Sequence, residues 1–465
     1  MLSGNRAGFF SEATAASSSS PPQPNVPANK VLITDNGHRY ELIYRVTHHE
    51  MDNILEDLPN MIPYNITQYT PGNIKPIRIQ LGRGRFSIAR LARRLFDDGT
   101  YKYYAVRKIR SFEDPTHSGH REAIINSTLR ELELQQKMRE IINCDHFSIA
   151  EDVVIKPNSR HETQIYQFIP LADLGTGENF LGRVKTIALS DTQKATILTY
   201  ISNIIISEVN TLNKNGFYIL DIKIENMLFS SKGDVWLSDF GSAAYHGADG
   251  TELHASTLSH AQYMPPFNLF HGNNQLACNR LHDQWGLGLA LLQVWSDADI
   301  NKSCKELFDL SLEYKKYIDA FKKDHSASPD NLLTQYQTAM TKLAQLPSFQ
   351  NIPEHIRMII LDTLDMNIRT RKKNLAEMVD HHASSLHMSD SAIAEARLLF
   401  DIAQSSPLAK SIRSQSSGNL RRNPFSFYYN SYDAEFIDSA TASLPRSSPS
   451  MESARRTPCP IPSRQ

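Results

Sequence analysis

Apolar and polar residues alternate with the two-residue period of half-buried β-strands over most of the first third of the chain. A helical spacing of apolar residues, from about Gly119 to Ile142, interrupts this alternation once. After Asp191 longer helical patterns dominate, beginning with a strongly apolar segment that Gly216 closes. The strand-like segments cover residues 77–82, 86–96, 100–109, 153–156 and 163–169. The pattern predicts an α+β fold, in which a five-stranded lobe with one main helix precedes a larger helical lobe.

Composition divides the chain further. Residues 1–29 are rich in Ser, Ala and Pro, so they cannot bury enough apolar surface to offset the entropy of ordering, and we expect disorder there. Residues 30–76 look ordered, but their sequence assigns them no task. The two-lobed pattern spans 77–385, and an amphipathic stretch predicts one more helix at 386–404. The remainder, 405–465, is rich in Ser, Pro and Arg and is expected to be disordered.

Charge and cysteine content exclude several classes of protein. The formal net charge is -1, so no global charge points to nucleic acid, and no apolar run approaches the length of a membrane span. Four scattered cysteines form no C-x-x-C pair, which favours a reducing, cytoplasmic location over a disulfide-rich or zinc-binding protein. A basic stripe could attract an anionic substrate or a lipid, although such a run is more often a solvated strand face. It consists of Arg83, Arg85, Arg90, Arg93 and Arg94.

The candidate chemistry lies in two short segments, ILDIKIENML (219–228) and LSDFGSAAY (237–245). Asn226 follows Asp221 by five residues, and Asp239 follows Asn226 by thirteen. A polar turn separates two strand-like runs, and a hairpin there would bring Asn226 and Asp239 to neighbouring positions. This spacing resembles the catalytic loop and DFG segment of eukaryotic-type protein kinases, in which such groups orient a hydroxyl and hold magnesium on a triphosphate.

The resemblance implies roles for residues elsewhere in the strand-rich lobe. LGRGRFSIA (81–89) resembles the kinase glycine-rich loop, with Gly82 and Gly84 present and Ser87 in place of the third glycine. In AVRK, Lys108 would contact the α- and β-phosphates. Glu131 is the helix carboxylate expected to pair with Lys108, and Glu133 is the alternative.

An adenine site is also implied. Ala89 and Val106 would lie above the ring and Leu228 below it. The linker from Gln167 to Ile169 would be the hinge. Tyr166 would face the pocket as gatekeeper.

Four departures from the family pattern affect what is expected. Ile219 and Leu220 replace the His-Arg pair before Asp221, so a phosphate on the activation segment loses its usual partner and activation-loop phosphorylation is not expected to be required. His260 and Phe267 alter the segment 259–267, and the loss of a glutamate at Phe267 deprives Arg371 of its ion-pair partner. DQWGLG (283–288) resembles the helix whose aspartate braces the catalytic loop.

The resemblance covers residues from about 77 to 385 and implies a two-lobed serine/threonine protein kinase. Asp221 would act as the base, and Lys223 would neutralise charge on the transferred γ-phosphoryl group. Asn226 and Asp239 would bind Mg²⁺ or Mn²⁺ for ATP. The expected partner is a protein with a Ser or Thr acceptor, with no nucleic acid and no assigned oligomeric state.

Three questions stay open at this point. One alternative is a pseudokinase that serves as a scaffold. Another is a kinase-fold enzyme with a non-protein acceptor or AMP-transfer activity. The divergence would suit a bacterial effector kinase delivered into a host cytosol as well as an outlying eukaryotic kinase.

Overall fold

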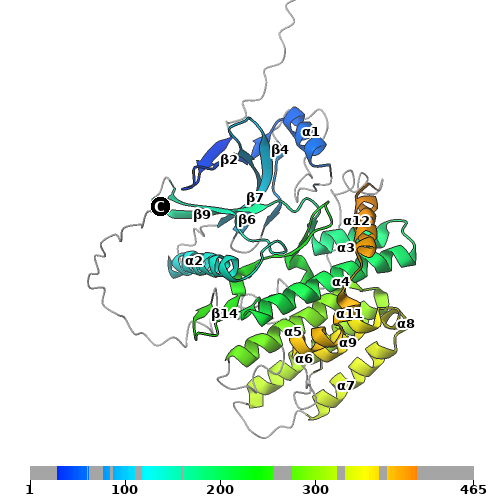
Figure 1. Cartoon of the computed structure of the whole chain (residues 1–465). Helices are drawn as coiled ribbons and strands as arrows, with labels where there is room; N and C mark the ends of the chain where they lie inside the picture. The colour runs from blue at the N-terminus through cyan, green and yellow to red at the C-terminus, as the bar shows by residue number, and fades with distance from the viewer. Residues whose placement is uncertain are drawn as a thin grey trace, which may run out of the picture. The chain divides into compact units, whose positions relative to one another are not determined.

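An antiparallel seven-stranded sheet organises the N-terminal part of the protein, seen here in a computed structural model (Figure 1). Its strands follow the order β1-β2-β6-β7-β9-β8, and β5 pairs with β6 at one end. Their bounds are β1 Lys30–Ile33, β2 Arg39–Ile43, β5 Gly82–Arg83, β6 Ser87–Leu95, β7 Tyr101–Ile109, β8 Asp152–Pro157 and β9 Thr163–Pro170. The structure describes residues 29–59, 61, 77–83, 87–109, 118–158, 161–254, 275–321, 330–365 and 374–405.

Three smaller sheets and twelve helices complete the described chain. The small sheets are β3 (Arg45–Val46) with β4 (Ile77–Arg78), β10 (Gly175–Thr176) with β12 (Met227–Phe229) and β13 (Val235–Leu237), and β11 (Phe217–Tyr218) with β14 (Ala244–His246) and β15 (Glu252–His254). The helices are α1 His48–Asp57, α2 Ser118–Ile141, α3 Gly177–Thr186, α4 Asp191–Lys214, α5 Gln275–Val294, α6 Ala298–Phe321, α7 Asp330–Gln345, α8 Pro347–Gln350, α9 Glu354–Thr363, α10 Leu375–His381, α11 Ala383–Leu386 and α12 Asp390–Ser405. The expected β-rich region and helical region are both present. Within the described residues, no helix is both long and apolar enough to cross a membrane.

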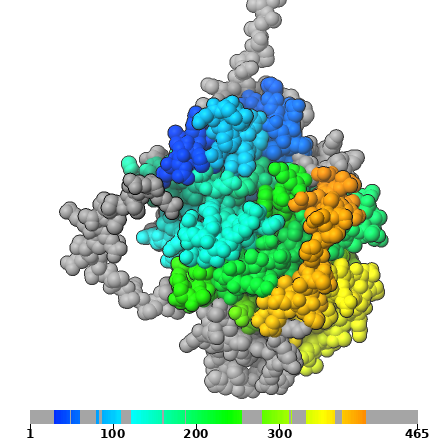
Figure 2. All heavy atoms as spheres, viewed as in Figure 1, coloured from blue at the N-terminus to red at the C-terminus, as the bar shows by residue number. Residues whose placement is uncertain are grey.

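The prediction of a five-stranded lobe is wrong in one respect, because residues before 77 contribute two strands to the main sheet. β1 and β2 form a hairpin, and β2 pairs with β6 from Leu91 to Leu95. The segment IRIQLG, expected to be the first strand of a meander, instead places Ile77–Arg78 in a separate pair with β3. Residues of β1 and β2 therefore belong to the sheet, and in Figure 2 the dark blue atoms of the N-terminal region lie against the lighter blue atoms that follow in the sequence.

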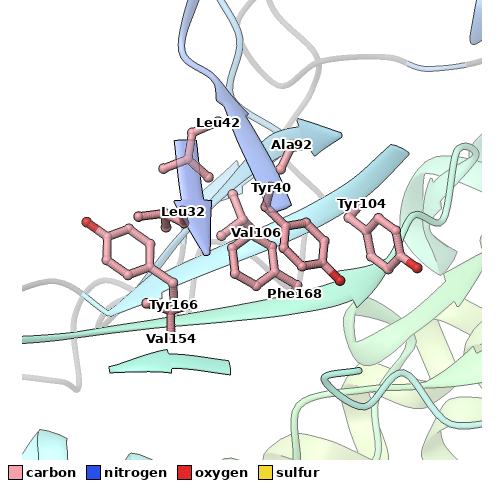
Figure 3. Close-up of a cluster of buried hydrophobic side chains, with 9 residues drawn as sticks. All are labelled: Leu32, Tyr40, Leu42, Ala92, Tyr104, Val106, Val154, Tyr166 and Phe168. Carbon is pink, nitrogen blue, oxygen red and sulfur yellow. The ribbon is translucent and has the colours of Figure 1, made fainter. Parts of the chain in front are cut away.

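The β1–β2 hairpin packs its alternating apolar residues onto one face of the sheet, which we call the outer face. Tyr40 stacks on Phe168 with ring centroids 3.8 Å apart (Figure 3). The hydroxyl of Tyr40 donates a 2.6 Å hydrogen bond to Asp152 Oδ2. Asp152 Oδ2 also lies 2.8 Å from His38 Nδ1. The buried cluster on this face comprises Leu32, Tyr40, Leu42, Ala92, Tyr104, Val106, Val154, Tyr166 and Phe168. The hairpin thus covers a face that would otherwise expose aromatic side chains.

The expected helices form with small changes in their bounds. Ser190 and Gln193 form a capping box at the start of α4, and Gly216 follows its end at a φ of 81°, where a side chain would overlap the carbonyl of His246. The additional helix expected at 386–404 is α12, which begins at Asp390. Phe400 on α12 stacks on Phe180 with ring centroids 4.6 Å apart, so this helix is packed against α3.

We predict that the N-terminal hairpin contributes to the stability of the whole sheet. Tyr40→Ala should lower the free energy of unfolding by about 3 kcal/mol or more, because it removes a fully buried aromatic ring and leaves Asp152 without one donor. Ile33→Ala, in the same hairpin but 64% exposed, should change it by less than about 0.5 kcal/mol. Urea unfolding of both variants checks this, and equal effects would show that the hairpin is peripheral.

Candidate active site

The β12–β13 hairpin brings the predicted metal-binding residues together. Met227 pairs with Leu237, and the amide of Ser238 donates to the carbonyl of Asn226 at 2.8 Å. Asp239 follows at once, in the left-handed conformation with φ 62°. The prediction that the hairpin places Asn226 beside Asp239 is therefore confirmed.

Asp221 projects into a buried group of polar side chains at the entry to this hairpin. Its Oδ2 atom accepts hydrogen bonds from Lys223 Nζ at 2.7 Å and from Asn226 Nδ2 at 2.9 Å. Asp221 is 4% exposed and Lys223 6% exposed, so solvent screens their attraction little. Asn226 Nδ2 also donates to the backbone carbonyl of Asp221, which orients the amide so that its oxygen faces away from this contact. All three side chains predicted for the catalytic loop thus meet.

Asp283 on α5 fixes the backbone that leads into Asp221. Its carboxylate accepts from the amides of Ile219 at 3.0 Å and Leu220 at 2.8 Å, and from Asn213 Nδ2 at 2.9 Å. Leu220 adopts a φ of 61°, which is unfavourable for a residue with a Cβ and is held here by these bonds. Burial raises the pKa of Asp283 to about 6, although all three donors favour its ionised form. The bracing aspartate that the resemblance implied is confirmed.

The basic residue that pairs with Glu131 is Arg107, so the expected Lys108–Glu131 pair is wrong. Arg107 Nη1 donates to Glu131 Oε1 at 2.6 Å, and Nη2 lies 3.4 Å from Asp239 Oδ1. Glu133, the alternative, is exposed on α2. Burial alone would lower the pKa of Arg107, but its attraction to Glu131 and Asp239 raises that pKa above its usual value. The arginine therefore links a buried helix carboxylate to the DFG-type aspartate.

Strand alternation explains the correction. Successive side chains of β7 point to opposite faces, so Arg107 lies on the inner face of the sheet and Lys108 on the outer face. Lys108 Nζ lies 5.5 Å from the ring centroid of Tyr166. Val106 and Tyr166, expected at the adenine, likewise belong to the outer-face cluster, on the face opposite Arg107.

Two other residues take the inner-face positions. Ala105, two residues before Arg107, shares its face, and Gln167 is the direct cross-strand partner of Arg107 on β9. Gln167 is fully buried, and its Nε2 makes no hydrogen bond to the described residues. A buried amide donor left without a partner is costly, so this atom fits a ligand acceptor.

The remaining nucleotide-site predictions fall on the inner face or on β12. Ala89 is the cross-strand partner of Arg107 on β6, and Ser87 Oγ accepts from Arg107 Nε at 3.3 Å. Ile169 is opposite Ala105, and Leu228 lies in the middle of β12. Gly82 pairs with Ala89. Gly84, His260, Phe267 and Arg371 lie outside the described residues.

Glu131 is positioned by a residue that the sequence did not single out. Gln135, one turn later on α2, donates to Glu131 Oε1 at 3.2 Å and accepts from the amide of Ala150 at 3.1 Å. Burial raises the pKa of Glu131, and Arg107 opposes this shift. Gly241 lies against both carboxylates, since a Cβ there would be 3.3 Å from Asp239 Oδ1. The four-residue spacing to Glu131 is the signal that would have identified Gln135.

The donor set fits a divalent cation on a nucleotide. Asn226 and Asp239 offer an amide and a carboxylate oxygen, which are the hard ligands that Mg²⁺ prefers when phosphates and waters supply the rest. Asp239 is about half exposed, with 47% of its side chain accessible, so it is open to such a ligand. The guanidinium of Arg107 lies beside it and provides donors for phosphate oxygens.

Comparison with known proteins agrees with this geometry. A family model described as "Protein kinase domain" matches residues 77–383. Serine/threonine-protein kinase TOS3 of Saccharomyces cerevisiae is 26% identical over 270 residues, which cover 54% of this chain and 45% of TOS3. A Caenorhabditis elegans protein named "cAMP-dependent protein kinase, catalytic subunit-like" is 23% identical over 244 residues, which cover 51% of this chain and 52% of the relative. The chain spans about half the length of these curated relatives.

We predict that His282, which precedes the bracing Asp283, makes the protein sensitive to acid. His282 is 4% exposed, and burial lowers its pKa from 6.5 to about 4. Below pH 6.5 the unfolded chain therefore binds the proton that the folded chain excludes, and stability is lost as the pH falls toward 4. The contribution from this residue is about 3 kcal/mol.

His282→Gln should abolish this contribution. Urea titrations at pH 7 and at pH 4 give the unfolding free energies of the variant and of wild type. Between pH 7 and pH 4 the variant should lose less stability than wild type. A difference that is independent of pH would contradict the prediction.

Proposed function

Because this chain belongs to the protein kinase family, we propose that it transfers the γ-phosphoryl group of ATP to serine or threonine hydroxyls of a protein substrate. The observation that carries the proposal is the hydrogen-bonded group of Asp221, Lys223 and Asn226, with Asp239 beside Arg107. Phosphoryl transfer depends mainly on positioning and electrostatic stabilisation, and such preorganised charges supply both.

Each residue of this group has a role in the proposed reaction. Asp221 orients the acceptor hydroxyl and takes its proton, and Lys223 stabilises negative charge on the transferred group. Asn226 and Asp239 would hold Mg²⁺ or Mn²⁺, which neutralises phosphate charge when bound. Arg107, held by Glu131, would bind the phosphates of ATP in the role first expected of Lys108.

The apolar residue Leu220, directly before Asp221, is consistent with transfer activity that does not require a phosphorylated activation segment. Leu220 packs against Tyr218 and Ala244, so an apolar side chain takes the place of a cation that would pair with such a phosphate. We propose that the buried carboxylate of Asp283, rather than a phosphate on the activation segment, holds the backbone that leads into Asp221.

Two carboxylates near Asp221 favour a basic acceptor sequence. Burial raises the pKa of Glu225. The positive charge of Lys223 opposes this shift, and the negative charges of Glu178 and Asp221 add to it. A cationic residue of the substrate would relieve this repulsion. A serine-containing peptide with arginines on both sides is therefore the first substrate to test.

A second candidate function follows from Arg107 itself. Arg107 forms ion pairs with both Glu131 and Asp239, so neither carboxylate is without a cationic partner. This arrangement favours a nucleotide-binding scaffold with little transfer activity. Binding of ATP without transfer would support this alternative. The mass of a modified acceptor would also separate phosphoryl transfer from AMP transfer.

We predict that Asp221→Asn lowers phosphoryl transfer about 10²- to 10⁴-fold while it preserves the fold, because the amide cannot accept the proton. Asp249→Asn, at the exposed β14–β15 turn, is the control with the same loss of charge and should retain wild-type activity. Transfer of labelled γ-phosphate to the basic peptide measures both. Undiminished activity in Asp221→Asn would refute the assignment.

We predict that Arg107, and not Lys108, serves the nucleotide. Arg107→Ala should lower transfer about 10²- to 10³-fold, as for loss of other charge-stabilising donors. Lys108→Ala should stay within about threefold of wild type, because its side chain lies on the outer face. Arg107→Lys distinguishes the two candidate functions, since retained or increased transfer indicates an enzyme. A larger loss in Lys108→Ala than in Arg107→Ala would reverse the assignment.

A further inference from the structure

Four cationic side chains gather around one buried tyrosine on the outer face of the sheet. Nζ of Lys30, Lys108 and Lys156 lies 5.7, 5.5 and 6.0 Å from the ring centroid of Tyr166, respectively. The guanidinium of Arg90 stacks on Tyr44, with its carbon 3.6 Å from the ring centroid. Arg90 also interacts electrostatically with Tyr166. We call Lys30, Arg90, Lys108 and Lys156 the cation cluster.

The fold brings these residues together from strands that are distant in the sheet order. Lys108 pairs with Tyr166 across β7 and β9, and Lys156 lies on β8, which is one edge of the sheet. Lys30 lies on β1, the opposite edge. Both edge strands contribute side chains to the cluster of Figure 3, where Leu32 and Val154 flank Tyr166. The cation cluster therefore lies where the two edges of the sheet approach each other.

The positive charge of the cation cluster has no carboxylate partner among the described residues, unlike that of neighbouring basic residues. Arg93 pairs with Glu41 at 2.5 Å, whereas no ion pair of the cation cluster is formed in the described part of the chain. Arg90 Nη1 is buried without a hydrogen-bond partner there.

The cations also repel one another. Burial lowers the pKa of Lys108, and the charges of Arg90 and Lys30 lower it further. Burial and then Lys30 do the same to Lys156. An anion at this position would remove the repulsion and supply acceptors.

We propose that the cation cluster is a docking site for a phosphorylated serine or threonine in a peptide segment. A phosphate monoester carries close to two negative charges and offers three acceptor oxygens, so one group can contact several of the four cations at once. The site is on the opposite face of the sheet from Arg107, and its occupancy does not depend on the proposed transfer activity.

The compact arrangement of the charges favours a phosphopeptide over a membrane or a nucleic acid. Three ammonium groups converge on a single ring, which matches one compact dianion. A membrane surface or a nucleic-acid backbone presents charges spread over a long or wide surface and would be matched by cations spread in the same way. The net charge of -1 adds no long-range attraction for either polyanion.

Occupancy of the site would connect the edges of the sheet. A phosphate held by Lys30 and Lys156 would bridge β1 to β8, in addition to the contacts of His38 and Tyr40 with Asp152. β8 pairs with β9, which carries Gln167 and Ile169 on its other face. Docking should therefore stabilise the sheet that positions the nucleotide site.

The test measures binding of a fluorescein-labelled peptide to phosphatase-treated full-length protein by fluorescence anisotropy. The probe is the peptide of residues 441–452, TASLPRSSPSME, with Ser448 phosphorylated, and the same peptide without phosphate is the comparison. Wild type should bind the phosphorylated form at least about tenfold more tightly. The double substitution Lys30→Gln/Lys156→Gln should abolish this preference.

The matched control is Lys137→Gln/Lys342→Gln, which removes the same charge from surface pairs with Glu140 and Glu306. This control should bind as wild type does. Thermal unfolding and ATP binding of both double variants report on folding.

Three results would overturn the proposal. The first is equal affinity for the two peptides, and the second is an equal loss in both double variants. The third is a protein that binds phosphatidylserine vesicles or single-stranded RNA but does not bind the phosphopeptide. If Lys30→Gln/Lys156→Gln abolished that binding, the cation cluster would have a different anionic partner.

Discussion

The buried carboxylate of Asp283 is the constraint on which the candidate active site depends. It accepts two consecutive backbone amides, those of Ile219 and Leu220, and so holds Leu220 in a left-handed conformation that its side chain disfavours. The reversal at Leu220 aims Asp221 at Lys223 and Asn226, and those two side chains then fix its carboxylate. Burying a carboxylate costs free energy, and the three hydrogen bonds that Asp283 accepts offset part of that cost.

The sequence predicted this part of the site well because its determinants are local. Asp221, Asn226 and Asp239 lie within one loop and one hairpin, where spacing alone decides which side chains meet. Glu131 was also predicted, as a carboxylate near the middle of a helix. Its basic partner was misplaced by one residue, and in a strand that error moves a side chain to the other face.

The error at Arg107 and Lys108 has a cause in the burial of the sheet. Alternation identifies the inner face of a strand only when the other face meets water. Here the β1–β2 hairpin covers the outer face, so TYKYYAVRKI carries apolar and basic residues on both sides and its pattern does not distinguish them. That hairpin pairs with β6 across some fifty residues of sequence, a long-range contact that composition and periodicity do not encode. The same contact explains why the sequence assigned no role to residues 30–76, and why it did not show that Val106 and Tyr166 belong to the outer-face cluster.

Neighbouring residues of β7 show how one strand serves two different electrostatic environments. Arg107 faces Glu131 and Asp239, so its positive charge is balanced by carboxylates inside the protein. Lys108, one residue later, faces Arg90 and Lys30, and the described residues around it bring more positive charge and no carboxylate. Because the strand is a rigid element shared by both faces, an anion that orders the cation cluster would also restrain the backbone of Arg107. The physical link between the two sites is therefore a single peptide bond, and the sheet that transmits it is the one that the N-terminal hairpin completes.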